Sequence, residues 1–164
     1  MFANRSVPPC TVIPELNYPD VTAAADWLCK AFGFTVRLRI GNHRIQMKFG
    51  DGCLIVAEAT SEKGLTAEAT SERGLTAEAT SERGLTAAGF VAGRAHSVML
   101  RVGDADSLSE RARQQGARIL KPPTSYPYGE RQCNIEDPFG HRWTLTQSIS
   151  DVAPEDWGGT PVDL

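Results

Sequence analysis

Residues 136–147 read EDPFGHRWTLTQ, and this stretch organises the rest of the chain. The segment Asp137-Pro138-Phe139-Gly140 supplies a turn, because proline fixes φ and glycine is free to adopt a positive φ. The residues that follow alternate between apolar and polar side chains, as expected of a half-buried β-strand. A fainter copy, FGDGCLIVAE, occupies residues 49–58. The chain therefore carries the same turn-and-strand unit twice.

The segments that precede the two copies repeat as well. An extended stretch at residues 10–16 leads into helical spacing that ends at Gly33, and Asp20 is the expected N-cap. The second half has an extended stretch at residues 97–102 and a helix that ends near Gly116, with Asp106 as its expected N-cap. Two further extended segments follow each helix. The order in each half is βαβββ, which predicts an α+β fold.

Five motifs make the chain similar to a known family. They are Tyr18-Pro19-Asp20, WLCKAFGF at 27–34, HSVM at 96–99, YPYGERQ at 126–132 and DPFGHRW at 137–143. Together they resemble the vicinal-oxygen-chelate superfamily, in its glyoxalase/bleomycin-resistance protein/dioxygenase branch. The resemblance implies that two βαβββ modules form a curled mixed β-sheet cup with the helices outside. It does not fix an activity, because this fold carries enzymes and simple binding proteins alike.

The expected domain organisation is a single glyoxalase-like domain at residues 10–149 with two flexible ends. Residues 1–9 form an N-terminal arm, and residues 150–164 form a C-terminal tail. Within the domain we expect module one at 10–58, an insertion at about 59–94 and module two at 95–149. The decapeptides VAEATSEKGL, TAEATSERGL and TAEATSERGL follow one another from residue 56 to residue 85. We expect this repeat to be a solvent-exposed, mobile or partly helical excursion; the alternative is a lid over the binding site.

Composition excludes several classes of function. A formal net charge of -3 without a basic cluster argues against nucleic-acid binding. The apolar runs are too short to span a membrane, and residues 1–9 lack the apolar core of a secretory signal. The four cysteines form no CxxC pair, which favours reduced thiols and a cytoplasmic location.

The resemblance also implies where a metal would bind. Metal enzymes of this family place ligands, usually His, Gln or Glu, at four equivalent strand positions. Alignment of the two modules puts these positions on Ile13, Val56, Ser97 and Thr144. None of the four is a good ligand for a catalytic metal, so we expect no metal and no cofactor. A shift in register would instead gather Glu15, Glu58 and His96, although strand alternation points His96 away from the cup.

Strand alternation predicts which side chains face the cup. They are Glu15, Asn17, Leu54, Val56, Glu58, Ser97, Met99, Arg101, Arg142, Thr144 and Thr146. A cup with apolar walls and a few charged groups suits an organic ligand that carries polar substituents. Arg101 is expected to pair with Glu15 or Glu58, or to meet a carboxylate or phosphonate of the ligand.

The loop before the last two strands adds aromatic side chains. Tyr126, Tyr128 and Trp157 are suited either to stacking on a planar ligand or to packing in the core and a dimer interface. Tyr128 and Arg131 are the better candidates for ligand contact. The predicted ligand-binding residues are therefore Glu15, Asn17, Val56, Glu58, Met99, Arg101, Tyr128, Arg131 and Thr144.

Two main function hypotheses follow, and a third has less support from the sequence. The first is a metal-free binding protein that sequesters a planar or hydrophobic small molecule in the cup, as bleomycin-resistance-like proteins do. The second is a metal-dependent lyase, isomerase or dioxygenase of the glyoxalase type. The third is a metal-free enzyme with Glu15 or Glu58 as a general base. The resemblance further implies a homodimer in which modules from both chains complete each cup.

Overall fold

The computed structural model describes residues 5–59 and 96–160, so the decapeptide repeat lies largely outside the described residues. The first module contains β1 (Glu15–Tyr18), α1 (Val21–Phe32), β2 (Thr35–Ile40), β3 (Arg44–Phe49) and β4 (Gly52–Glu58). The second contains β5 (Val98–Arg101), α2 (Ala105–Gln114), β6 (Arg118–Ser125), β7 (Glu130–Glu136) and β8 (Arg142–Ser148). A short 3-10 helix, η1 (Pro154–Trp157), follows. The predicted α+β fold with two βαβββ modules is confirmed.

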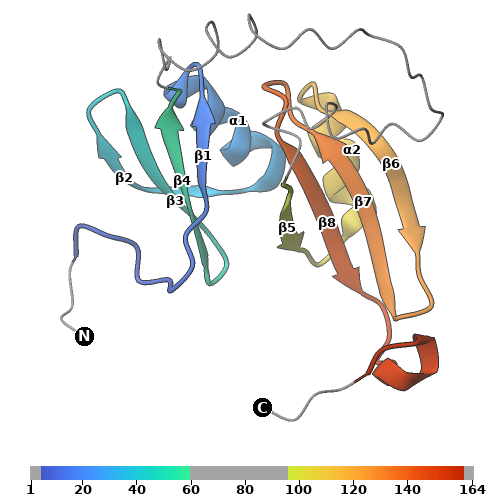
Figure 1. Cartoon of the computed structure of the whole chain (residues 1–164). Coiled ribbons are helices and arrows are strands. Elements are labelled where there is room, and N and C mark those ends of the chain that lie inside the picture. Colours follow the sequence, from blue (N-terminus) through green and yellow to red (C-terminus); the bar gives the residue numbers. More distant parts are fainter. Residues whose placement is uncertain (1–4, 60–95, 161–164) are drawn as a thin grey trace, which may run out of the picture.

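Each module forms one four-stranded mixed sheet. Sheet A has the order β1-β4-β3-β2, and sheet B has the equivalent order β5-β8-β7-β6. The first strand of each module pairs in parallel with the last one, and the remaining pairs are antiparallel. Figure 1 shows the two sheets side by side, with β1 and β5 as the edges that approach each other. Both helices pack on one face of the sheets, and we call the opposite face of each sheet its open face.

The helices begin where the sequence supplies a carboxylate acceptor for their free N–H groups. Asp20 Oδ1 accepts from Ala23 N at 2.9 Å, as predicted. In the second module Asp104 is the N-cap, and its Oδ1 accepts from Ser107 N at 3.0 Å. The expectation of Asp106 was wrong by two residues, because Asp106 already lies in the first helical turn, where it pairs with Arg131.

One continuous core joins the modules, since buried side chains of both belong to the same cluster. Side-chain hydrogen bonds cross the junction at several points. Tyr18 Oη donates to Asp137 Oδ2 at 3.0 Å, Trp27 Nε1 donates to Gln115 O at 2.7 Å, and Arg111 Nε donates to Ala31 O at 2.8 Å. No helix in the described part of the chain is long and apolar enough to cross a membrane.

Candidate functional site

The sheet register decides which side chains face the cup. Aligned residues of a parallel pair point to the same side of the sheet, and Leu16 is aligned with Val56. Both belong to the core on the helix side, and Val56 is 0% exposed. The expectation that Leu54 and Val56 face the cup was therefore wrong. Ile55, aligned with Glu15, is the residue of β4 that lies on the open face.

The error has a physical cause in the two turns. Between Phe49 and Gly52 the turn has two residues, whereas five residues separate Glu136 from Arg142. An alignment through turns of different length shifts the following strand. In the structure Ile55 is the equivalent of Thr144, because Glu15 pairs with Ile55 as Met99 pairs with Thr144.

The corrected set of family metal positions is Ile13, Ile55, Ser97 and Thr144. Two of these side chains are aliphatic and two are hydroxyls, and neither type is a preferred ligand of a catalytic divalent metal. Among the described residues no group of three or more His, Cys, Asp or Glu side chains converges as a metal site would require. A cofactor metal therefore has no fitting donor set in the described part of the chain.

The predicted carboxylates of the first module do not converge. Glu15 lies on the open face and forms an ion pair with Arg44, at 2.5 Å. Asn17 is exposed on the same face. Glu58 is aligned with Tyr18, whose ring is in the core, so Glu58 belongs to the other side of the sheet, at its exposed end. The prediction that Arg101 pairs with Glu15 or Glu58 was therefore wrong, because Glu15 pairs with Arg44 and the carboxylate near Arg101 is that of Glu130.

On sheet B the polar side chains of the open face form a connected network. Arg101 lies within 3.6 Å of Glu130 and also contacts Ser148. Glu130 accepts hydrogen bonds from Ser148 Oγ at 2.6 Å and from Thr146 Oγ1 at 2.5 Å. These hydroxyl donors, Ser148 first, hold the pKa of Glu130 below its ordinary value. Arg101 itself stays largely exposed, so its guanidinium remains open to an anion.

The network continues to the aromatic loop. Gln132 donates to Thr146 Oγ1 at 3.2 Å and accepts from Tyr128 Oη at 3.0 Å. The rings of Tyr126 and Tyr128 stack with centroids 5.1 Å apart, and Trp157 of η1 lies 5.3 Å from Tyr128. The tail thus folds back onto this loop.

Arg131 does not join that surface. It alternates with Gln132 along β7 and forms a two-pronged ion pair with Asp106 of α2, at 2.5 and 2.6 Å. This pair lowers the pKa of Asp106, with the hydrogen bonds from Arg131 as the largest cause. The structure therefore places Arg131 where it fixes α2 to the sheet.

The histidines stand apart from one another. His141 Nε2 lies 2.9 Å from the carbonyl oxygen of Asn17, and its ring packs 4.3 Å from that of Tyr18, so it helps to join the modules. His43 is exposed in the β2–β3 hairpin, and His96 is exposed just before β5.

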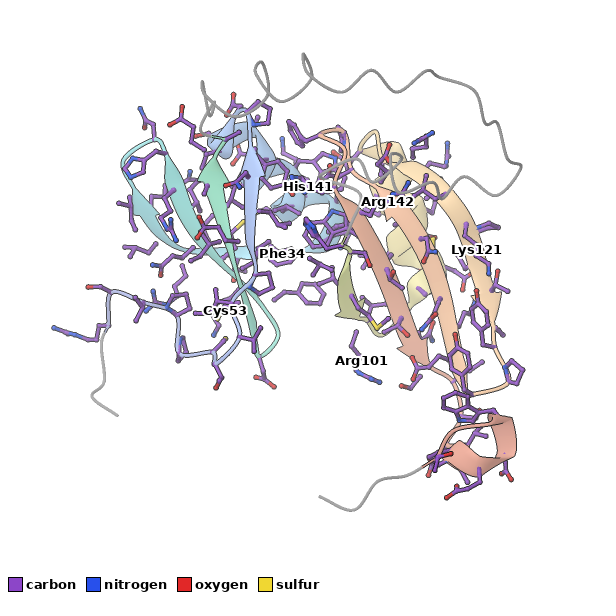
Figure 2. All side chains as sticks on the ribbon, viewed as in Figure 1. Phe34, Cys53, Arg101, Lys121, His141 and Arg142 are labelled. Atoms are coloured by element: carbon purple, nitrogen blue, oxygen red, sulfur yellow. The ribbon has the colours of Figure 1, made fainter. Side chains whose placement is uncertain are left out.

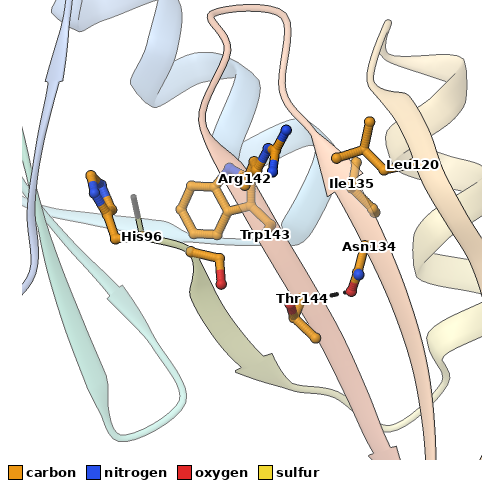
Figure 3. A pocket seen from close by; sticks show the side chains of 8 residues that line it. His96, Leu120, Asn134, Ile135, Arg142, Trp143 and Thr144 are labelled. Carbon is orange, nitrogen blue, oxygen red and sulfur yellow. Dashed lines mark hydrogen bonds between the residues drawn. The ribbon is translucent and has the colours of Figure 1, made fainter. Parts of the chain in front are cut away.

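A pocket of about 230 Å³ opens beside β8 (Figure 3). Its lining residues are His96, Ser97, Leu120, Asn134, Ile135, Arg142, Trp143 and Thr144. Thr144 Oγ1 donates to Asn134 Oδ1 at 3.3 Å, which fixes both side chains at the floor. Met99, 59% exposed, is aligned with Thr144 and extends this surface toward β5.

Arg142 is the distinctive residue of this pocket. Its Nε is buried, and no acceptor among the described residues hydrogen-bonds to it. The carboxylate of Glu136 is 4.0 Å away, beyond hydrogen-bond distance, and is already engaged at 2.7 Å by Arg118. Strand alternation predicted that Arg142 faces the cup. The sequence alone does not predict that its Nε lacks a hydrogen-bond acceptor, because this depends on the ion pair between Glu136 and Arg118.

Solved structures with the same fold include one described as an antibiotic binding protein and one described as a lyase. TioX from Micromonospora sp. ML1 is 27% identical, with a TM-score of 0.57 over 85% of this chain and 99% of that chain. TnmS3, an antibiotic binding protein from Streptomyces sp. CB03234, is 20% identical, with a TM-score of 0.55 over 83% of this chain and 93% of that one. Lactoylglutathione lyase from Agrobacterium tumefaciens is 16% identical, with a TM-score of 0.55 over 87% and 97%. The last two likenesses show the fold alone.

A curated relative and a family model give the sequence side of the comparison. An uncharacterized protein of Mycobacterium bovis is 32% identical over 62 residues, which are 38% of this chain and 41% of the relative. The match therefore spans less than half of that relative. The model of the Glyoxalase/Bleomycin resistance protein/Dioxygenase superfamily matches residues 10–145, most of the chain. Together with the two βαβββ modules, this match shows that the chain belongs to the Glyoxalase/Bleomycin resistance protein/Dioxygenase superfamily.

Proposed function

We propose that the chain is a binding protein that sequesters a small organic ligand on the open face of sheet B, without a metal. The observation that carries the proposal is the buried Arg142 Nε in the pocket of Figure 3. A buried donor without a partner costs about 1–3 kcal/mol, and a ligand acceptor removes that cost when the Arg142 side chain, 37% exposed, turns its Nε toward the pocket. TnmS3, described as an antibiotic binding protein, supports a binding role for this fold.

The ligand inferred from these groups is apolar or planar with one acceptor oxygen. Its oxygen, from a carboxylate, phenolate or carbonyl, accepts from Arg142, and its apolar part rests on Leu120 and Met99. Arg101 and Tyr128 lie farther along the same open face and are available to a larger ligand. On sheet A, Glu15 and Asn17 remain candidates for the opposite wall.

A second copy of the chain is part of the proposal. The pocket volume of about 230 Å³ is smaller than typical sites for drug-sized ligands, which occupy about 300–1,000 Å³. A homodimer that brings another open face against sheet B enlarges the site. Sedimentation with and without ligand tests this point, and a strictly monomeric liganded protein contradicts it.

The binding test uses planar aromatic compounds in pairs, with and without an acceptor oxygen, and follows the fluorescence of the three tryptophans. We expect Arg142→Gln to weaken binding of the acceptor compound by about 10- to 100-fold, the value of a hydrogen bond to a charged group. Arg118→Gln is the matched control, since Arg118 also pairs with Glu136 but does not line the pocket. An equal loss of affinity in both variants would contradict the assignment of Arg142 as the residue that binds the ligand oxygen.

A metal titration tests the metal-free part. Protein stripped with a chelator is titrated by calorimetry with Mn²⁺, Fe²⁺, Ni²⁺ and Zn²⁺, beside a Glu15→Ala variant, because Glu15 lies on the open face. We expect no stoichiometric binding. Stoichiometric binding that is lost in the variant would overturn the proposal in favour of a metal-dependent enzyme.

A further inference from the structure

The N-terminal segment covers part of the open face of sheet A, where it is attached to β2 and β3. The carbonyl oxygen of Arg5 accepts from Arg37 Nη2 at 2.7 Å, and that of Ser6 accepts from Gln46 Nε2 at 2.8 Å. Gln46 is aligned with Ile55 on the open face and is only 2% exposed. Strand β4 is therefore buried on both sides, by the core on one and by the N-terminal segment on the other.

This course of the chain brings two cysteines together. Cys53 lies on the open face of β4, two residues before Ile55, and is 7% exposed. Cys10 Sγ donates to the carbonyl oxygen of Asp51 at 3.3 Å, two residues from Cys53 along the chain. The Cys53 thiol is the neighbouring group with the largest effect on Cys10, and it raises the pKa of that thiol. Figure 2 shows Cys53 at the end of the sheet along which the N-terminal segment runs.

We propose that Cys10 and Cys53 are a reversible dithiol–disulfide pair that, when oxidised, fastens the N-terminal segment across the open face of sheet A. The oxidant is a low-molecular-weight disulfide. The Cys10 thiolate attacks one sulfur of that compound, its S–S bond breaks, and one thiol leaves. The Cys53 thiolate then attacks the Cys10 sulfur of the mixed disulfide and expels the second thiol. The protein loses two electrons and two protons, and the small disulfide is reduced to two thiols.

The other two cysteines provide the contrast. Cys29 lies on α1 and Cys133 lies on β7, and the groups that perturb their thiols include no cysteine. Burial is the largest cause that raises the pKa of each. Neither therefore has a partner thiol for the second step, so a mixed disulfide at either cysteine cannot close into an internal disulfide.

Oxidation would act on a cavity between the modules. A groove of about 460 Å³ is lined by Val12, Pro14 and Cys53 on one side and by Met99 and Arg101 on the other. Val12 and Pro14 lie two and four residues after Cys10 in the chain. A disulfide at Cys10 therefore holds one wall of this groove in place, whereas the reduced segment is held without a covalent bond.

The test exposes the full-length protein to glutathione disulfide over a pH series up to the ordinary thiol pKa of 9.0, followed by thiol titration after denaturation and by peptide mapping. We expect two of the four thiols to disappear, faster as the pH rises, with Cys10 and Cys53 in one cross-linked peptide. Cys29→Ser, the matched control, should form the same cross-link, whereas Cys10→Ser should form none.

Trypsin cleavage after Arg5 supplies a second measurement. Oxidised wild-type protein should be cut more slowly than reduced protein, and Cys10→Ser should show no such difference. A wild-type protein that keeps four thiols throughout the series, or a cross-link that includes Cys29 or Cys133, would overturn the pair. Equal cleavage of the oxidised and reduced forms would overturn the fastening of the segment.

Discussion

Asp137, in the turn before β8, accepts hydrogen bonds both from its own turn and from the first module. The side chain is 4% exposed and accepts four hydrogen bonds. Oδ1 accepts from the backbone of Phe139 and His141, each at 2.9 Å, and so shapes the turn. Oδ2 accepts from Tyr18 at 3.0 Å and Trp143 at 3.1 Å, and so joins the modules. Burial and the neighbouring Asp137 raise the pKa of Tyr18, so its phenol stays protonated and donates.

We predict that Asp137→Ala lowers the free energy of unfolding by about 3–5 kcal/mol, because it leaves four donors without their acceptor in a buried place. Asp137→Asn keeps one carbonyl oxygen and should lose clearly less. Urea denaturation of both variants and wild type gives the comparison. Losses of less than 1 kcal/mol in both would contradict the role assigned to this carboxylate.

The depressed pKa of Glu130 predicts a pH dependence of stability. Its folded-state pKa is below the ordinary value of 4.5, chiefly through the hydrogen bond from Ser148. The stabilisation is therefore fully present above the unfolded pKa and is lost as the pH falls through the folded pKa. We expect a smaller slope of unfolding free energy against pH in Glu130→Gln than in wild type below pH 4.5. An unchanged slope in the variant would remove Glu130 as the source.

Among the elements, the C-terminal tail is held by a glycine. Gly129, before β7, has φ +79, and its carbonyl oxygen accepts from Ile149 and Ser150 of the tail at 2.8 and 3.2 Å. A Cβ at this position would lie 2.3 Å from the carbonyl oxygen of Ser150. The close approach places η1 so that Trp157 contacts Tyr128.

We predict that Gly129→Ala weakens the attachment of the tail. A non-glycine residue in the left-handed region costs about 1–3 kcal/mol, and the contact with Ser150 adds to this cost. Gly140→Ala is the matched control, because Gly140 has φ +94 but open space around its Cβ position. Urea denaturation and proteolysis of residues 149–160 should show the larger change in Gly129→Ala. If the two variants behave alike, the packing against Ser150 is unimportant.

For the whole molecule, the shared core predicts a single unfolding transition. Trp143 of β8 packs with Phe32 and Phe34 of the first module, at ring-centroid distances of 5.1 and 6.1 Å. Neither module can unfold without exposing part of the other. Tryptophan fluorescence and far-UV circular dichroism should therefore give the same denaturation midpoint. Two separate transitions would show that the modules fold independently.

The junction itself can be weakened by one bond. Trp27→Phe removes the donor to Gln115 O, at 2.7 Å in the wild type, and should cost about 1 kcal/mol. Because the core is shared, both spectroscopic probes should shift by the same amount.

Local sequence determined the elements of this protein. Glycine and proline punctuation, an N-cap at Asp20 and two periodic patterns are properties of neighbouring residues, and they predicted the βαβββ order of both modules. The turn at 137–140 also predicted β8 and the face of its side chains, so Thr144 and Arg142 were placed correctly on the open face.

Tertiary structure decided what depends on residues far apart in the chain. The register of β4 against β1 put Ile55, not Val56, on the open face, because a slip of one residue reverses every side chain of a strand. The ion-pair partners also depend on tertiary packing: Glu15 pairs with Arg44, and Arg131 pairs with Asp106. The lack of a hydrogen-bond partner for Arg142 Nε and the effect of Cys53 on Cys10 likewise arise only once separate strands and the N-terminal segment are packed together.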